Sequence, residues 1–327
     1  MADKSISEIV ELASAYYGSA VLFAALEHDV FGRIERGETP AGRGFRLLLD
    51  ACVAEGLLTK DGGKYRNTSS GKAALIAGGP ADLTKAIRYN RDVYPVWGKL
   101  AEFVSTDRPV ERPEIHLGED AARTKAFAAA MFGRAMGIGR CVVPMLNLPA
   151  LPLNSTPKIL DLAGGPGAYA ILMCQANLGA TCVTVDLPAI SAEAKDYVEK
   201  FGLTNRIECR AGDYHTDEYE SAAYDLVTIF GALHQESPED IVGILKRANR
   251  ALKPGGRVII LDLMTDATHT APKFSALFAL NMALTTDNGW VFSDEELKGW
   301  MREAGFVPSE TRVVPPPMPH WLVEGRK

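Results

Sequence analysis

Three aspartates lie at the ends of three β-rich segments, beside glycine or aromatic residues. Asp161 opens a turn that ends at Gly167, whose glycines let a ligand approach the backbone and whose following helix offers free N–H groups. Asp186 ends the next segment, where a carboxylate can accept hydrogen bonds from ribose hydroxyls. Asp213, followed by Tyr214, can meet the exocyclic amine of adenine while the ring flanks the base. The pattern predicts a nucleoside site.

The residues around these aspartates alternate between strand and helix patterns, as a parallel α/β sheet requires. The β-rich runs are Lys158–Ala163, Thr181–Leu187, Arg206–Asp213, Tyr224–Phe230 and Arg257–Met264. Ser237 and Pro238 begin the helix before the last run, its apolar stripe reaches Leu252, and Pro254-Gly-Gly256 is expected to end it. A helix capped at Ser293 and two further strands, within residues 306–314 and 320–323, complete this half.

The first 75 residues predict helices followed by a hairpin around Asp61-Gly62-Gly63, which together form a winged-helix-like unit. Residues 81–148 are helical in pattern, and the proline-rich stretch Leu148–Pro157 is the best linker candidate. We therefore expect a winged-helix-like domain at 1–80, a helical linker region at 81–150 and an α/β domain at 151–327.

Composition limits the classes of protein that remain. In 327 residues, 47% are hydrophobic and 23% charged, which excludes wholesale disorder, and a net charge of −6 disfavours binding to nucleic acid. A winged-helix DNA-binding regulator is also disfavoured because Glu38–Phe45 leaves little room for the helix before a recognition helix. Five cysteines without C-x-x-C spacing predict reduced thiols. The amphipathic beginning and the lack of a long apolar run favour a cytoplasmic protein without a membrane span.

Several motifs together resemble the class I S-adenosylmethionine-dependent methyltransferases. The G-x-G-x-x-G dinucleotide fingerprint does not fit, since positions 163, 165 and 168 are Ala, Gly and Ala. Residues 161–167, 185–188, 212–214 and 252–262 match the cofactor motifs and the fifth strand of that family, with Ala163 where Gly is more usual. More narrowly, the chain resembles small-molecule O-methyltransferases with an N-terminal winged-helix dimerisation domain.

This resemblance implies an α/β fold: a Rossmann-like domain of seven strands with the last one antiparallel, beside a mainly helical dimerisation domain. It also implies S-adenosylmethionine as cofactor, S-adenosylhomocysteine as product, a small-molecule acceptor and a homodimer. The cofactor-binding residues we expect are Asp161, Gly164, Gly165, Gly167, Asp186, Leu187, Asp213, Tyr214 and Phe230. We expect a flat, apolar acceptor, and the residues we expect to bind it are Met131, Phe132, Asn281 and Met282.

The resemblance further implies a general base, His234, oriented by Asp262. A neutral imidazole there could take the proton of an acceptor hydroxyl as the methyl group moves to oxygen. Two departures weaken the match. The family often has His-Asp-Trp where this chain has His234-Gln-Glu236, and Val291 occupies the place of a second acid. No metal is expected, because no histidine pair or carboxylate cluster has ligand spacing.

Two alternatives therefore stay open. The first is carbon methylation of a flat conjugated acceptor, such as a tetrapyrrole or polyketide, with His234 only lining the pocket. The second is a cofactor-binding scaffold that has lost catalysis.

Overall fold

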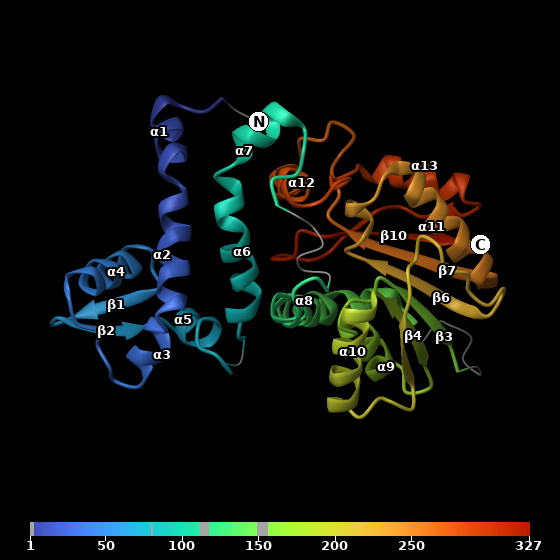
Figure 1. Ribbon diagram of the computed structural model, residues 1–327, viewed down its shortest axis with the longest axis horizontal. Helices are drawn as coiled ribbons and strands as arrows, with labels where there is room; N and C mark the ends of the chain where they lie inside the picture. Colours follow the sequence, from blue (N-terminus) through green and yellow to red (C-terminus); the bar gives the residue numbers. More distant parts are fainter. Residues whose placement is uncertain (1–2, 80, 112–117, 149–155) are drawn as a thin grey trace. The chain divides into compact units, whose positions relative to one another are not determined.

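The computed structural model describes residues 3–79, 81–111, 118–148 and 156–327 (Figure 1). The chain divides into two compact units, Met1–Asp92 and Val93–Lys327, and the division falls inside one helix, α6 (Thr84–Trp97). The domain limits expected at residues 80 and 150 stay predictions. Most of the expected linker, Leu148–Pro157, lies outside the described residues.

The N-terminal unit has the expected helices followed by a hairpin. Strands β1 and β2 pair antiparallel, and the turn between them uses Gly62 and Gly63, both with positive φ. Phe31, Leu49 and Leu58 lie in its core and are fully buried. Its elements are α1 (Ile6–Ser14), α2 (Tyr16–Glu27), α3 (Val30–Glu35), α4 (Arg43–Ala54), β1 (Leu58–Asp61), β2 (Lys64–Asn67) and α5 (Ser69–Ala74).

The second unit is built on one mixed sheet with the order β5-β4-β3-β6-β7-β10-β8, and β9 also pairs with β10. Strands β3 to β7 are parallel and β10 runs antiparallel to β7, which confirms the expected topology. The sheet has eight strands because the segment expected as one strand at 306–314 forms two short ones. The strands are β3 (Lys158–Leu162), β4 (Thr181–Asp186), β5 (Ile207–Ala211), β6 (Tyr224–Phe230), β7 (Leu252–Asp262), β8 (Val307–Pro308), β9 (Arg312–Val313) and β10 (Trp321–Arg326).

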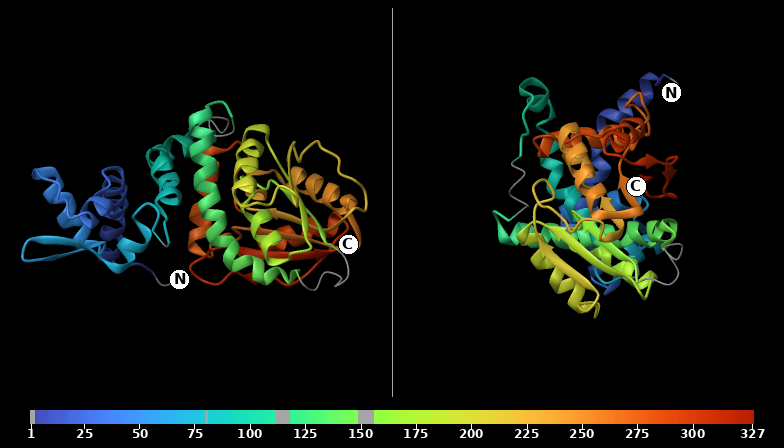
Figure 2. Two further views of the ribbon diagram at one scale, coloured as in Figure 1. Left: turned by 90° about the horizontal axis from the view of Figure 1, so that it is seen from below. Right: turned by 90° about the vertical axis from the view of Figure 1, so that its right-hand side faces the viewer.

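Helices cover both faces of this sheet (Figure 2). One hydrophobic cluster joins alternate strand residues to α11 and α13, and the other joins the intervening residues to α8, α9 and α10. Both faces are apolar, as expected for strands buried between two helical layers. The helices of this unit are α7 (Leu100–Thr106), α8 (Ala121–Val142), η2 (Val143–Leu146), α9 (Ala168–Ala176), α10 (Pro188–Lys200), η4 (Leu233–Gln235), α11 (Pro238–Ala251), α12 (Lys273–Thr285) and α13 (Asp294–Glu303).

Local signals locate the helix starts better than the helix ends. The Ser237 hydroxyl accepts the N–H of Asp240 at the start of α11, and Ser293 forms a capping box with Glu296 at the start of α13. The end of α11 was predicted too late. The helix stops at Ala251, and Leu252 already belongs to β7, where the backbone pairs with β6 beside Tyr224.

Two helical stretches, Ile6–Glu27 and Ala121–Leu146, are long and apolar enough by length and composition to cross a membrane. This corrects the expectation that the chain holds no such run. The second stretch packs on α9 and α10 and supplies residues such as Val142 to the core, as core helices of soluble proteins also do. Only 6% of the first is buried within the structure.

Candidate active site

The turn after β3 has a backbone that depends on glycine. Gly165 and Gly167 have φ values of +57° and +80°, and Gly167 precedes α9. A Cβ on Gly164 would lie 1.9 Å from the Thr184 hydroxyl and 2.6 Å from a carboxylate oxygen of Asp161. Ala163 also has positive φ, +51°, at the position where the family more often has glycine. The turn therefore brings bare backbone to the carboxyl edge of the sheet.

Asp161 and Asp186 border this turn. Asp161 is fully buried; its Oδ1 accepts the Thr228 hydroxyl at 2.6 Å, and its Oδ2 has no partner among the described residues. Burial, together with the charge of Asp186, raises the pKa of Asp161 to about 7. Asp186 accepts the N–H groups of Gly165 and Leu187, each at 2.8 Å, and burial raises its pKa to about 6. Two carboxylates with raised pKa values suit a site that receives a cation.

The third aspartate, Asp213, lies where β5 ends, at the same edge of the sheet. Its Oδ1 accepts the N–H of His215 at 2.9 Å and lies 2.8 Å from the ring Nδ1 of that histidine. Tyr214 donates its hydroxyl to Glu236 at 2.6 Å. The sheet thus places the three expected acids at the carboxyl ends of β3, β4 and β5, where ligands bind in open α/β sheets.

His234 and Asp262 form a buried pair. His234 Nδ1 lies 2.5 Å from Asp262 Oδ1, while Asp262 Oδ2 accepts the backbone N–H of His234 at 3.3 Å. A carboxylate at Nδ1 favours the tautomer with its proton there, so Nε2 is the nitrogen left to accept a proton. Phe278 of α12 packs edge-on against the imidazole, with 5.4 Å between ring centroids. The pairing expected from the sequence is present.

Val291, at the place where the family has a second acid, is apolar, as the sequence shows. Val291 is buried, and among the described residues Asp262 is the only carboxylate hydrogen-bonded to His234. This segment nevertheless contacts His234, because Trp290 donates its backbone N–H to the carbonyl of His234 at 2.9 Å.

The expected acceptor residues divide into two groups. Asn281 and Met282 are buried on α12, one turn after Phe278, and Asn281 Oδ1 accepts the indole N–H of Trp97 at 2.9 Å. Phe132 instead stacks on Tyr197 of α10 at 3.8 Å, so its ring packs α8 against α10. Met131 is half-buried on α8, and Phe230 packs edge-on against Tyr169. The roles of all these residues in binding stay predictions.

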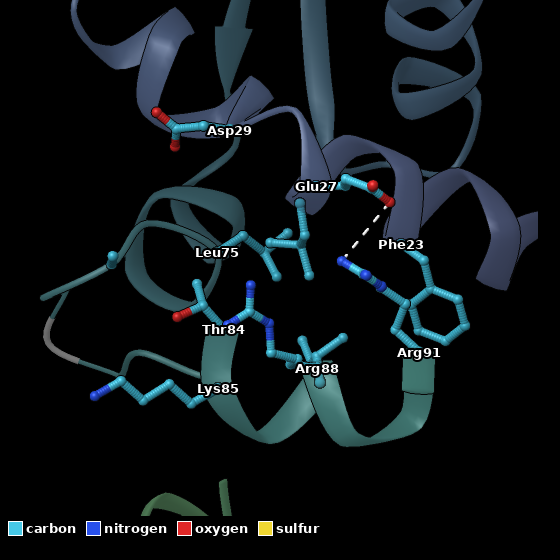
Figure 3. A pocket seen from close by; sticks show the side chains of 11 residues that line it. Phe23, Glu27, Asp29, Leu75, Thr84, Lys85, Arg88 and Arg91 are labelled. Atoms are coloured by element: carbon cyan, nitrogen blue, oxygen red, sulfur yellow. Dashed lines mark ion pairs between the residues drawn. The ribbon is translucent and has the colours of Figure 1, made fainter. Parts of the chain in front are cut away.

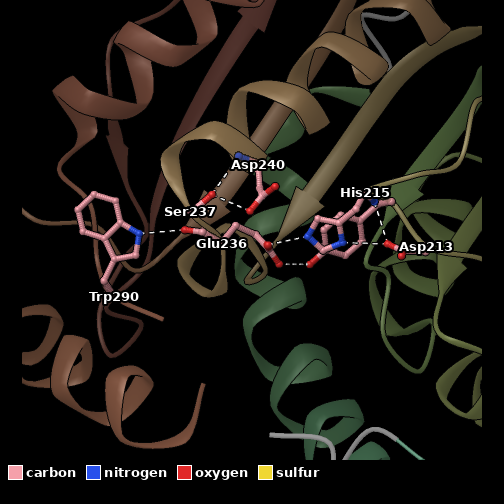
Figure 4. A network of polar contacts seen from close by, with 7 residues as sticks. Asp213, His215, Glu236, Ser237, Asp240 and Trp290 are labelled. Atoms are coloured by element: carbon pink, nitrogen blue, oxygen red, sulfur yellow. Dashed lines mark hydrogen bonds and ion pairs between the residues drawn. The ribbon is translucent and has the colours of Figure 1, made fainter. Parts of the chain in front are cut away.

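The sequence did not reveal one polar cluster. His215, Glu236 and Asp240 bring possible ligand atoms within 4.8 Å of one another (Figure 4). Hydrogen bonds already engage them: His215 Nε2 lies 2.6 Å from Glu236 Oε2, and Asp240 accepts the Ser237 hydroxyl. The change from the common His-Asp-Trp to His234-Gln-Glu236 was the one available signal.

A cavity of about 520 Å³ is lined wholly by residues of the N-terminal unit (Figure 3). Apolar residues such as Leu75 line it together with Arg88 and Arg91. Arg91 Nη1 lies 3.7 Å from Glu27 Oε2, so the two side chains form an ion pair. It includes no residue of the expected cofactor or acceptor sites.

Comparison with known proteins decides the family. A family model described as an O-methyltransferase domain matches residues 114–307. The chain belongs to the O-methyltransferase family. This methyltransferase is 30% identical over 320 residues to the 3-hydroxy-5-methyl-1-naphthoate 3-O-methyltransferase of Streptomyces sahachiroi, covering 94% of this chain and 90% of the relative. It is also 30% identical over 337 residues to the tetracenomycin polyketide synthesis 8-O-methyl transferase TcmO of Streptomyces glaucescens, with 98% and 96% covered.

The crystal structure of human N-acetylserotonin methyltransferase in complex with S-adenosylmethionine matches the fold with a TM-score of 0.85. The sequences are 25% identical, and the match covers 100% of this chain and 98% of the human one. The methyltransferase is therefore an S-adenosylmethionine-dependent enzyme with the fold expected from its sequence. The turn, in which Gly164 leaves no room for a Cβ, and the unpaired Asp161 oxygen fit a positively charged nucleoside cofactor.

A test of the cofactor site is Asp186→Ala. We expect affinity for S-adenosylhomocysteine, measured by calorimetry, to fall at least ~10-fold because a charge-assisted hydrogen bond to the ribose is lost. Since the pKa of Asp186 is raised to about 6, wild-type affinity should rise as the pH increases through 6. The variant should lack this rise. Asp61→Ala, at an exposed position of the hairpin, is the matched control and should keep wild-type affinity. Unchanged affinity in Asp186→Ala would reject the ribose assignment.

Proposed function

We propose that this methyltransferase transfers the methyl group of S-adenosylmethionine to a phenolic hydroxyl on a fused aromatic acceptor. The observation behind the proposal is the buried pair of His234 and Asp262, with Nδ1 engaged and Nε2 left as the proton acceptor. The naphthoate and tetracenomycin enzymes among its relatives bear names that describe such acceptors.

The cofactor supplies an electrophilic methyl group on a sulfonium. The residues of the chain need only align the acceptor and remove its proton. His234 Nε2 takes the proton of the hydroxyl as the oxygen forms its bond to the methyl carbon and the carbon–sulfur bond breaks. The resulting imidazolium is stabilised by the carboxylate of Asp262, as in other histidine–carboxylate pairs.

Helix α12 provides the features expected for orienting the acceptor. Phe278 contacts His234, and Asn281 lies about one turn further along the same helix. The Trp97 indole fixes Asn281 Oδ1, while Asn281 Nδ2 is buried without a partner in the described part of the chain. A buried donor left unpaired costs about 1–3 kcal/mol. A carbonyl or carboxylate oxygen on the acceptor would remove that cost, which favours acceptors with an oxygen substituent besides the hydroxyl.

A set of matched naphthalenes tests this acceptor class. A hydroxynaphthoic acid should be methylated, its methyl ether should not react, and a naphthol without the carboxylate should react with higher KM. Asn281→Ala should reduce the difference in KM between the naphthoic acid and the naphthol. Equal kcat/KM for the hydroxylated compounds in the wild type would overturn the role of the second oxygen, and no transfer to any hydroxyl would overturn the acceptor class.

We also propose a homodimer formed through the N-terminal unit. Helices α1 and α2 expose a run of apolar residues: Ile6, Ile9, Val10, Leu12, Tyr16 and Tyr17. Contiguous apolar surface of this kind is typical of protein interfaces. Phe31 of the same unit does not contribute to this surface, because it is buried in the core.

For assembly, we expect sedimentation to show a dimer at micromolar concentration. The double variant Ile9→Glu/Val10→Glu places two charges in the apolar run and should shift the protein to monomer. Val104→Glu, on an exposed position of α7, is the control and should stay dimeric. A wild-type monomer at micromolar concentration would refute the proposal.

A further inference from the structure

Glu236 is a buried carboxylate where the family often has a tryptophan. Its side chain is 9% exposed. Oε1 accepts the Tyr214 hydroxyl at 2.6 Å, and Oε2 lies 2.6 Å from His215 Nε2. Its backbone carbonyl accepts the indole N–H of Trp290 at 3.0 Å (Figure 4). One residue thus contacts the segment after β5 and the segment before α13.

His215 lies between two carboxylates. Nδ1 is 2.8 Å from Asp213 Oδ1, and Nε2 is 2.6 Å from Glu236 Oε2. A neutral imidazole has one N–H, so at one of these contacts its lone pair would face a carboxylate lone pair. Only the imidazolium donates to both. With both carboxylates ionised, the geometry therefore favours a protonated His215.

The surrounding charges support that protonation state. Asp240 of α11 adds a third carboxylate near the ring. The positive charge of Arg247, on the same helix, helps to lower the pKa of Asp213. Burial alone lowers the pKa of His215, but the hydrogen bonds and charges of Glu236 and Asp213 outweigh burial and raise it. The imidazolium therefore persists to a higher pH than an unperturbed histidine would.

These contacts join three parts of the active site. Asp213 and Tyr214 belong to the expected adenine side, and His234 precedes Glu236 by two residues. The backbone N–H of Trp290 binds the carbonyl of His234 at 2.9 Å, while its indole binds Glu236. A shift of Glu236 would move the wall of the cofactor site and the loop of the base together.

We propose that Glu236, bridged by the His215 imidazolium, is a positioning residue that holds the adenine side of the cofactor site against the loop of the base, so that loss of the His215 proton weakens cofactor binding. The proposal rests on the cofactor placement tested with Asp186. The bridge is intact below the raised pKa of His215 and is lost as the pH rises through it. Cofactor affinity should therefore fall on the alkaline side, opposite to the rise that Asp186 produces near pH 6.

Calorimetry with S-adenosylhomocysteine across the pH range tests the bridge. We expect wild-type affinity to fall at alkaline pH, and the fall to vanish in Glu236→Gln and in His215→Gln. Each variant should bind ~10-fold more weakly at neutral pH, as expected for a lost charge-assisted pair. The double variant should be no weaker than either single one, because both remove the same contact. His28→Gln, in the N-terminal unit, is the control and should keep the wild-type profile.

A second readout separates positioning from general destabilisation. Proton NMR of the His215 ring should show its pKa drop in Glu236→Gln, with the melting temperature measured in parallel. A wild-type affinity that stays flat at alkaline pH, or a His215 pKa unchanged in Glu236→Gln, would overturn the proposal. So would tighter cofactor binding on adding Zn²⁺ that Asp240→Asn abolishes, because His215, Glu236 and Asp240 would then be metal ligands. Failure of the wild type to bind S-adenosylhomocysteine at any pH would instead reject the cofactor site itself.

Discussion

His234→Ala is expected to lower kcat by ~10²–10⁴-fold, the usual contribution of a general base. The structure gives the reason: Asp262 holds Nδ1 at 2.5 Å, so the imidazole is oriented and Nε2 is the free acceptor of a proton. Removal of the ring should leave S-adenosylhomocysteine affinity intact, because the acids of the cofactor turn are separate residues. Saturating both substrates and measuring kcat isolates the chemical step.

The carboxylate partner of His234 should contribute less to kcat than His234 itself. Asp262→Asn should reduce kcat less, since it alters the orientation of the ring and the stability of the imidazolium but leaves Nε2. A His234→Ala enzyme with nearly full kcat would show that His234 only lines the pocket.

Gly164→Ala should have the second large effect, on cofactor binding. The new Cβ would lie 1.9 Å from the Thr184 hydroxyl and 2.6 Å from Asp161 Oδ2, and both side chains are buried and short. Overpacking of this kind costs about 1–3 kcal/mol, so the turn must move away from the position that binds the cofactor. We expect ~10–100-fold weaker binding of S-adenosylhomocysteine in calorimetry, with a lower free energy of unfolding.

Two variants control for this result. Gly299→Ala, in α13, has open space around the new methyl group and should leave both binding and stability unharmed. Thr184→Ala in the Gly164→Ala background removes the closest clash and should restore part of the affinity. Wild-type affinity in Gly164→Ala would mean that the cofactor does not approach this turn.

The sequence predicted most of the fold because its local signals agree with the packing. Ser237 and Ser293 cap helices as expected, and the three strands that end at or just before Asp161, Asp186 and Asp213 lie next to one another in the sheet. The end of α11 was missed because pairing of Leu252 with Tyr224 outweighs the helical pattern. Tertiary contacts of this kind leave no trace in a window of sequence.

In the candidate site, too, the sequence predicted some features and missed others that depend on tertiary contacts. The pairing of His234 with Asp262 followed from the family resemblance, which places a histidine just after β6 and an acid at the end of β7. The bridge between His215 and Glu236 could not be predicted, because the two residues are 21 positions apart and meet only where two loops converge. Phe132 stacks on Tyr197, because one apolar helix face can pack on a neighbouring helix as well as line a pocket, and its role in binding the acceptor stays a prediction.

The position of the transferred methyl group tests the central claim most directly. The wild type would be incubated with S-adenosylmethionine labelled with ¹³C on the methyl group and a hydroxynaphthoic acid, and the product examined by NMR. A labelled methoxy group at the hydroxyl position, formed far more slowly by His234→Ala, is the predicted result. A labelled methyl group on ring carbon, formed at the same rate without His234, would contradict the account and establish carbon methylation.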